Sequence, residues 1–207
     1  MGFITPDTFI KNTKGKAYDI DKVAGVQCVD GIKKFTLDIY GKYDFNCGSC
    51  GYAYGLWTNY GSNGVEKYFI QVPFKEAVKG DWIIWNKGSK DAPTSHVAMY
   101  ISSNSSKVQA YGQNQNGKKA FNTASISTNG ILGVLRCREY LAHIMYKKGD
   151  TNNVVGKIDN LLAKQIKGNK YGDYTESSVK VYQSKHNLPK TGKVDFITYE
   201  VMQKEGL

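Results

Sequence analysis

Cysteine and proline are scarce in this sequence, whose 207 residues include four of each. Four cysteines are too few to hold a scaffold of this length together by disulfides. Long apolar runs are also absent, since stretches such as Ile131–Leu135 fall far short of the roughly 18 residues that span a bilayer. The first residues, Met1–Pro6, contain no basic segment followed by an apolar block. We therefore expect neither a secretory signal nor membrane insertion.

Acidic residues are the next shortage. Asp and Glu number 18 against 28 Lys and Arg, for a net charge of +10, which favours an anionic partner such as nucleic acid or a phosphate-rich surface. The basic residues form no dense patch interleaved with aromatic residues, and no nucleic-acid-binding motif is present. We therefore expect no nucleic-acid partner. With 41% hydrophobic residues, the chain can bury a core.

The pattern changes along the chain. The first part combines a helical apolar period over 27–40 with short strand-like runs separated by Gly, Ser and Asn, which predicts an α+β fold with a mostly antiparallel sheet. The polar stretch 147–153 is interpreted as a linker. The predicted domains are therefore 1–146 and 154–207, joined by that linker.

The second predicted domain contains short amphipathic segments. Apolar residues at Ile158, Leu161, Leu162 and Ile166 mark one helix face, a further helix starts near Thr175, and a last one is predicted over 196–204. These segments predict a small all-α, three-helix domain.

Cys28 begins the predicted helix of the first domain, where unpaired backbone N–H groups and the helix dipole favour a thiolate. Of the three histidines, His143 and His186 fall beside the linker or in the second domain. This leaves His96, at the start of a strand-like run, as the candidate base. Asn114 supplies a third, orienting group if the alternation of the next strand continues. A polar strand end facing water fits the same residue.

Three motifs of the first domain occur in order: Gly25–Asp30 (GVQCVD), Lys79–Trp85 (KGDWIIW) and Ser95–Tyr100 (SHVAMY). Together they resemble the CHAP family, the cysteine- and histidine-dependent amidohydrolases/peptidases. The resemblance implies a papain-like fold that cleaves peptidoglycan, with Cys28 as nucleophile and His96 as base.

The resemblance also assigns the residues around this pair. Gln27 and the backbone N–H of Cys28 are expected to form the oxyanion hole. Many members carry Glu-Gln-Asn on the strand after the histidine, with the Glu and Asn near the imidazole. This chain has Gly112, Gln113 and Asn114 there, so of the two only Asn114 is retained.

An acidic loop precedes the nucleophile. Asp19, Asp21 and Asp30, with the backbone carbonyls of Val23 and Gly25, offer the oxygen ligands that Ca²⁺ prefers. The spacing is not that of an EF-hand, and a solvated acidic turn fits it equally well. Phage members of the CHAP family carry calcium in this loop on Asp residues at these positions, so the resemblance implies a structural Ca²⁺ site.

The other cysteines suggest no metal site. Cys47 and Cys50 form a CxxC, but a second pair of zinc ligands at suitable spacing is missing. A local disulfide and two plain thiols both remain open. Cys137 lies in a strand-like run and is interpreted as a small buried hydrophobe.

The second domain resembles the peptidoglycan-binding-domain-1 type of cell-wall module. The similarity lies in Val179–Gln183, the Leu188-Pro189 pair, and the final helix start at Asp195–Thr198. It implies binding of peptidoglycan, and the positive charge suits teichoic-acid-rich walls. A small helical appendage to the first domain is the alternative.

We therefore predict a peptidoglycan hydrolase of the phage endolysin type, an N-acetylmuramoyl-L-alanine amidase or a peptide-bridge endopeptidase. It is expected to be a monomer, made in the host cytoplasm without a signal peptide and released to the wall through a holin. The alternatives are a non-enzymatic, calcium-dependent wall-binding protein on a papain-like fold and, on charge alone, a nucleic-acid-binding protein. Tyr52, Trp57 and Tyr60 are candidate groove residues for specificity.

Overall fold

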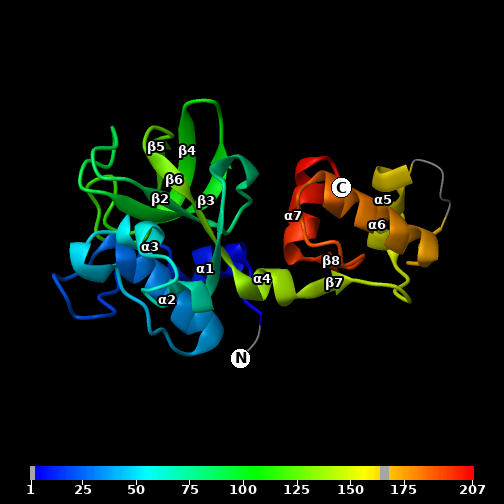
Figure 1. The fold of residues 1–207 in the computed structure, drawn as a ribbon, viewed down its shortest axis with the longest axis horizontal. Coiled ribbons are helices and arrows are strands. Elements are labelled where there is room, and N and C mark those ends of the chain that lie inside the picture. The colour runs from blue at the N-terminus through cyan, green and yellow to red at the C-terminus, as the bar shows by residue number, and fades with distance from the viewer. Residues whose placement is uncertain (1–2, 164–167) are drawn as a thin grey trace. The chain divides into compact units, whose positions relative to one another are not determined.

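The computed structural model describes residues 3–163 and 168–207 and divides the chain into two units, Met1–Arg138 and Glu139–Leu207 (Figure 1). The observed division lies within the helix α4, Arg138–Ala142, and so differs from the predicted linker at 147–153. In the part of the chain that the structure describes, no helix has the length and apolarity needed to cross a membrane.

The first unit is built on a six-stranded antiparallel sheet with the strand order β1-β6-β2-β3-β4-β5. This confirms the predicted α+β class with an antiparallel sheet. The crossover order places the fully buried β2 at the centre, paired on one side with β6 and on the other with β3. The strands are β1 Phe69–Val72, β2 Trp82–Trp85, β3 His96–Ser103, β4 Lys107–Gly112, β5 Asn122–Ser127 and β6 Ile131–Cys137.

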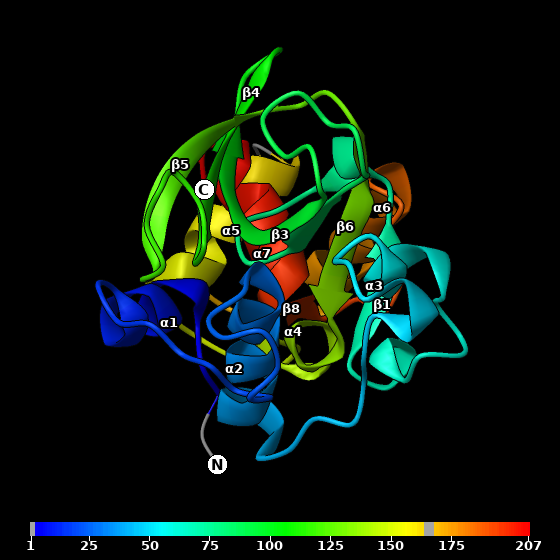
Figure 2. The ribbon, with the colours of Figure 1, turned by 90° about the vertical axis from the view of Figure 1, so that its left-hand side faces the viewer.

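Helices α1, Pro6–Thr13, and α2, Cys28–Tyr40, lie together on one side of this sheet (Figures 1 and 2). The helix predicted over 27–40 is confirmed as α2. Its start is held by Asp30, whose Oδ2 accepts the backbone N–H of Gln27 at 2.8 Å, and Gly41 ends it with a left-handed φ of 73°. The shorter helical segments are η1 Gly48–Cys50, α3 Gly55–Thr58, η2 Val65–Lys67 and η3 Phe74–Glu76.

An aromatic cluster joins the two helices to the sheet. The ring of Phe9 from α1 lies 5.3 Å from Phe35 of α2, 6.2 Å from Trp82 of β2 and 5.5 Å from Phe121, and all four side chains are buried. Gly31 of α2 faces this cluster, because a Cβ there would lie 3.3 Å from the Phe121 ring. The glycine that weakens the helix locally therefore allows its close approach to the core.

The opposite face of the sheet has its own buried core. It includes the β2 residues that alternate with Trp82, as expected for a strand buried on both faces. Its large members are Val72, Ile83, Trp85, Tyr100, Val108, Ile126 and Val134.

A buried ion pair fastens β6 to the turn before β2. Arg136 donates from Nε to Asp81 Oδ1 at 3.0 Å and from Nη2 to Asp81 Oδ2 at 2.8 Å, and both side chains are almost fully buried. The same Asp81 oxygen accepts the backbone N–H of Val78. The Asp of the KGDWIIW motif is therefore a structural residue in this fold.

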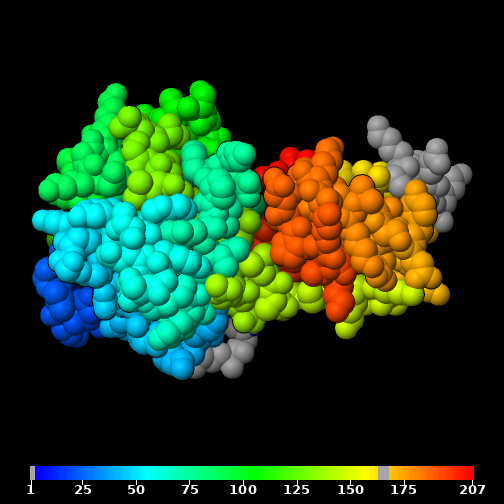
Figure 3. All heavy atoms as spheres, viewed as in Figure 1, coloured from blue at the N-terminus to red at the C-terminus, as the bar shows by residue number. Residues whose placement is uncertain are grey.

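In its described residues the second unit contains three longer helices and a two-stranded antiparallel sheet, β7-β8. The prediction of an all-α domain is therefore wrong, because these two short strands pair across a wide sequence separation that local patterns do not report. Its buried core includes Val155, Ile158, Tyr171, Val179 and Val194. The helix predicted over 196–204 is confirmed, and Ile166 lies outside the described residues. Helix α6 (orange) forms part of the surface in Figure 3. The elements are α4 Arg138–Ala142, whose first residue belongs to the first unit, β7 Ile144–Tyr146, α5 Asn153–Ala163, α6 Asp173–Lys185, β8 Val194–Asp195 and α7 Phe196–Lys204.

The stretch predicted as a linker belongs to this second unit. Gly149 donates its N–H to Tyr171 O at 2.9 Å, and Tyr171 donates to Asp150 O at 2.8 Å. Strand β7, predicted to belong to the first domain, pairs with β8 fifty residues further along the chain. The polar composition of 147–153 marks a hydrogen-bonded turn rather than a flexible connection.

Candidate active site

Cys28 and His96 line one cavity of about 700 Å³ in the first unit. Cys28 is the first residue of α2 and is partly exposed, as its position in the sequence predicts. His96 is the first residue of β3, pairs with Trp85 of β2, and is 7% exposed. Helix α2 packs on β3, which brings the two side chains close enough for each to shift the pKa of the other.

The pair is arranged to carry opposite charges. Burial on its own raises the pKa of the Cys28 thiol, but the charge of His96 and hydrogen bonds from His96, Val97 N and Val29 N outweigh it, and the pKa is lowered. Burial acts on His96 in the opposite sense, yet the Cys28 charge and hydrogen bonds to Cys28 and Gln115 raise its pKa. The geometry therefore favours a thiolate–imidazolium pair over a range of pH.

The predicted contact between Asn114 and His96 is wrong. Gln115 contacts the imidazole instead, with its Oε1 2.8 Å from His96 Nε2. Strand β4 ends at Gly112, and Asn114 adopts a left-handed φ of 53°, so the alternation that would aim Asn114 at the histidine stops before it. Asn114 Nδ2 donates to Gln27 Oε1 at 3.0 Å.

Gln27 lies beside the nucleophile on the cavity wall. One N–H of its amide donates to Ala24 O at 2.8 Å, and the second remains available to a substrate oxygen. The backbone N–H of Cys28 is a second donor, because the first N–H groups of a helix have no partner within the helix. These are the two donors that the sequence assigns to an oxyanion hole.

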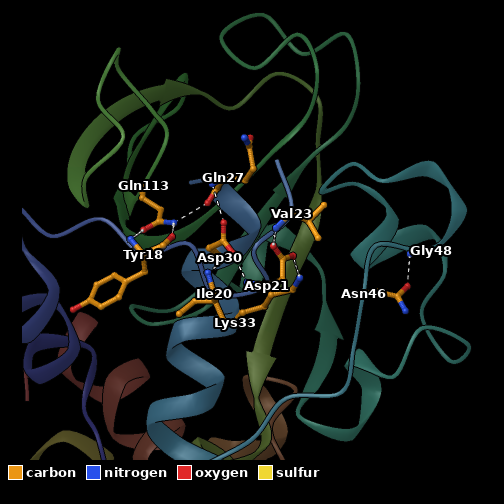
Figure 4. Close-up of polar contacts among 10 residues, drawn as sticks. All are labelled: Tyr18, Ile20, Asp21, Val23, Gln27, Asp30, Lys33, Asn46, Gly48 and Gln113. Carbon is orange, nitrogen blue, oxygen red and sulfur yellow. Dashed lines mark hydrogen bonds and ion pairs between the residues drawn. The ribbon is translucent and has the colours of Figure 1, made fainter. Parts of the chain in front are cut away.

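Gln113, the middle residue of the motif at the end of β4, connects this wall to the preceding loop (Figure 4). Its buried amide donates to Gln27 O at 2.8 Å and to Tyr18 O at 2.7 Å, and accepts from Tyr18 N at 3.2 Å. Satisfying three backbone groups at once is typical of a structural glutamine.

The three acids of the loop converge. One carboxylate oxygen from each of Asp19, Asp21 and Asp30 lies within 4.8 Å of the others. Asp30 Oδ1 accepts from the backbone N–H groups of Ile20 at 2.9 Å and Asp21 at 3.3 Å, and Asp21 forms an ion pair with Lys33 (Figure 4).

These residues fit a calcium ion. Asp19 Oδ1 is buried without a hydrogen-bond partner, a costly arrangement that a cation would relieve. Asp21 Oδ1 accepts only a local hydrogen bond, from the N–H of Val23. Ala24 O, between the predicted carbonyl ligands Val23 and Gly25, is taken by Gln27.

Of the remaining sequence candidates, Tyr52 alone lines the cavity. Cys47 and Cys50 are both free thiols, and burial raises the pKa of Cys47 to about 12. Of the three candidate groove aromatics, Tyr52 lines the cavity. Tyr60 donates to Phe69 O at 3.1 Å, and the Trp57 ring occupies the space that a side chain at position 133 would need.

Comparison with known proteins gives three findings. Residues 133–202 match the family model described as "Putative peptidoglycan binding domain". Over 124 residues, or 59% of this chain, the sequence is 34% identical to a "D-alanyl-L-alanine endopeptidase" of Streptococcus phage B30, and the chain spans 27% of that relative's length. The crystal structure of the endolysin LysIME-EF1 is similar at a TM-score of 0.46 and 18% identity, covering 90% of this chain and 98% of that chain.

Proposed function

We propose that the chain is a CHAP-type peptidoglycan hydrolase that cleaves an amide bond of the bacterial cell wall with a Cys28 nucleophile. The observation that carries the proposal is the pairing of Cys28, at the N-terminus of α2, with His96 on the wall of one cavity of about 700 Å³, where each shifts the pKa of the other. The identity to a phage endopeptidase and the match of 133–202 to a peptidoglycan-binding family support the same substrate.

The reaction follows from these groups. The Cys28 thiolate attacks the carbonyl carbon, and the developing oxyanion accepts hydrogen bonds from the Cys28 N–H and the Gln27 amide. His96 gives its proton to the nitrogen of the breaking C–N bond, so that an amine leaves and an acyl-thioester remains. His96 then takes a proton from water, whose oxygen attacks the thioester and releases a carboxylic acid.

The second unit and the loop have supporting roles in this proposal. The second unit binds peptidoglycan, and the net charge of +10 adds attraction to anionic teichoic acids. Asp19, Asp21 and Asp30 would hold a Ca²⁺ ion, whose double positive charge would reduce the repulsion among the three converging carboxylates. Gln113 and Asp30 connect that loop to Gln27 through backbone hydrogen bonds, so an ordered loop keeps the oxyanion donor in place.

Lysis of purified walls tests the mechanism. Cys28→Ala and His96→Ala should each reduce the rate by orders of magnitude, whereas Cys50→Ala, a matched change of a thiol outside the cavity lining, should retain it. Lysis by Cys28→Ala at the unmodified rate would overturn the proposal.

The bond is identified by mass spectrometry of the released fragments. The name of the phage relative favours an endopeptidase, which frees amino groups within the peptides. Free lactyl groups on muramic acid would instead indicate an amidase.

A further inference from the structure

The group that contacts His96 opposite the thiol is an amide. Gln115 Oε1 lies 2.8 Å from His96 Nε2, and the two side chains belong to residues that are 6% and 7% exposed. A hydrogen bond buried to this extent does not exchange readily with water, so it fixes the orientation of the His96 ring.

The orientation of this amide is set by its other contacts. Gln115 Nε2 donates to two backbone carbonyls, Asn122 O at 2.8 Å and Ala110 O at 3.2 Å. A flipped amide would place its oxygen against both carbonyls, so the network assigns Oε1 to the imidazole. An oxygen has no proton to give, and His96 Nε2 must therefore carry the hydrogen. The proton exchanged with Cys28 is then the one on Nδ1.

The local backbone makes room for this side chain. A Cβ at Gly112 would lie 3.1 Å from Gln115 Oε1 and 2.9 Å from Ala98 Cβ, so a larger residue at 112 would compete for the same space. Beyond the strand, Asn114 and Asn116 both have left-handed φ values, and a bridge pairs Gln115 with Lys118. This tight turn reverses the chain, so that the Gln115 side chain reaches Ala110 O of β4.

We propose that Gln115 is the positioning residue of the catalytic histidine, and that it locks His96 in the Nε2–H tautomer. The inference deepens the proposed function and rests on it for the role of the pair, but the tautomer itself is independent of substrate. Because Gly112 has no Cβ, there is space beside it for the amide of Gln115. Because the orienting group is neutral, Cys28 and His96 alone titrate in this contact.

The tautomer is measured by long-range ¹H–¹⁵N NMR on the full chain. A Cys28→Ser background removes the thiolate, so that the imidazole is neutral at alkaline pH, and loss of one signal set in His96→Ala assigns the resonances. We expect a single Nε2–H form. Adding Gln115→Met, which keeps the side-chain length without the acceptor, should give a mixture of both tautomers. Gln71→Ala, which removes an amide hydrogen bond to Trp57 O elsewhere in the same unit, should leave the Nε2–H form.

Activity gives the second readout. In the otherwise unmodified chain, Gln115→Met should lower kcat on wall fragments on the order of 100-fold with little change in KM. Gly112→Ala should act in the same direction, because the new methyl group displaces the amide while Gln115 remains. This second variant keeps the test decisive if the methionine variant fails to fold.

An unchanged Nε2–H tautomer in folded Gln115→Met or Gly112→Ala would overturn the inference. If Cys28→Ala abolishes lysis but these variants keep the tautomer, the inference alone fails. If the chain lyses no wall while the tautomer responds as expected, the proposed function fails and the positioning contact stands.

Discussion

Replacing His96 by alanine should change how the reactivity of Cys28 depends on pH. In the structure the His96 charge and hydrogen bond oppose the effect of burial and lower the pKa of the thiol. Without the imidazole, burial dominates and the pKa should rise to at least the ordinary value of about 8.5. Such a thiol is about 1% thiolate at pH 6.5, and that fraction rises tenfold per pH unit up to its pKa.

The sign follows from the pair. The lowered pKa of Cys28 and the raised pKa of His96 both enlarge the fraction of the pair that is thiolate and imidazolium near neutral pH. Between about pH 6 and 8, alkylation of Cys28 should therefore rise less than tenfold per pH unit in the unmodified protein, whereas in His96→Ala it should rise about tenfold per unit. The slope is the useful quantity, since a thiolate of low pKa is also a weaker nucleophile and absolute rates partly compensate.

The assay is a timed reaction with iodoacetamide, followed by mass spectrometry of the peptide that contains Cys28. The Cys47 peptide serves as an internal control, because burial raises the pKa of that thiol to about 12 and it should stay unlabelled over the same range. A tenfold rise per unit in the unmodified protein, or a flat profile in His96→Ala, would refute the thiolate–imidazolium pair.

Three further outcomes are expected. Asp81→Asn removes the carboxylate charge that faces the buried guanidinium of Arg136 and should lower the free energy of unfolding of the first unit by about 3–5 kcal/mol. Urea titration followed by tryptophan fluorescence measures this loss, since all three tryptophans lie in that unit. An unchanged midpoint would contradict the expectation. The control is Asp44→Asn, which removes one partner of an exposed ion pair. A fragment 139–207 should melt at a higher temperature than 147–207, because the shorter one lacks the β7 partner of β8; equal melting curves by circular dichroism would return the boundary to 147–153. Chelation by EDTA should lower the melting temperature and the lytic rate, and added Ca²⁺ should restore both. Asp19→Asn should reproduce the loss. If neither quantity responds to the chelator, the loop is a solvated acidic turn and not a calcium site.

Local interactions explain why much of the first unit could be predicted from the sequence. Helix α2 begins at Cys28 and ends before Gly41, because an acidic side chain at its first turn and a left-handed glycine after its last turn act within a few residues. His96 begins β3, as the strand-like apolar run that follows it indicates. The sequence of these segments was therefore sufficient to predict that the nucleophile lies at a helix N-terminus and the base at the start of a strand.

Contacts between distant segments decided the rest. The unit boundary lies at 138 because β7 pairs with a strand fifty residues away, and no composition signal in the polar stretch 147–153 reports that pairing. Gln115 rather than Asn114 contacts the histidine because a left-handed turn ends the strand alternation, and the space it fills exists because position 112 has no side chain. Periodicity describes a strand while it lasts; where the strand stops, the tertiary structure determines which side chain reaches the site.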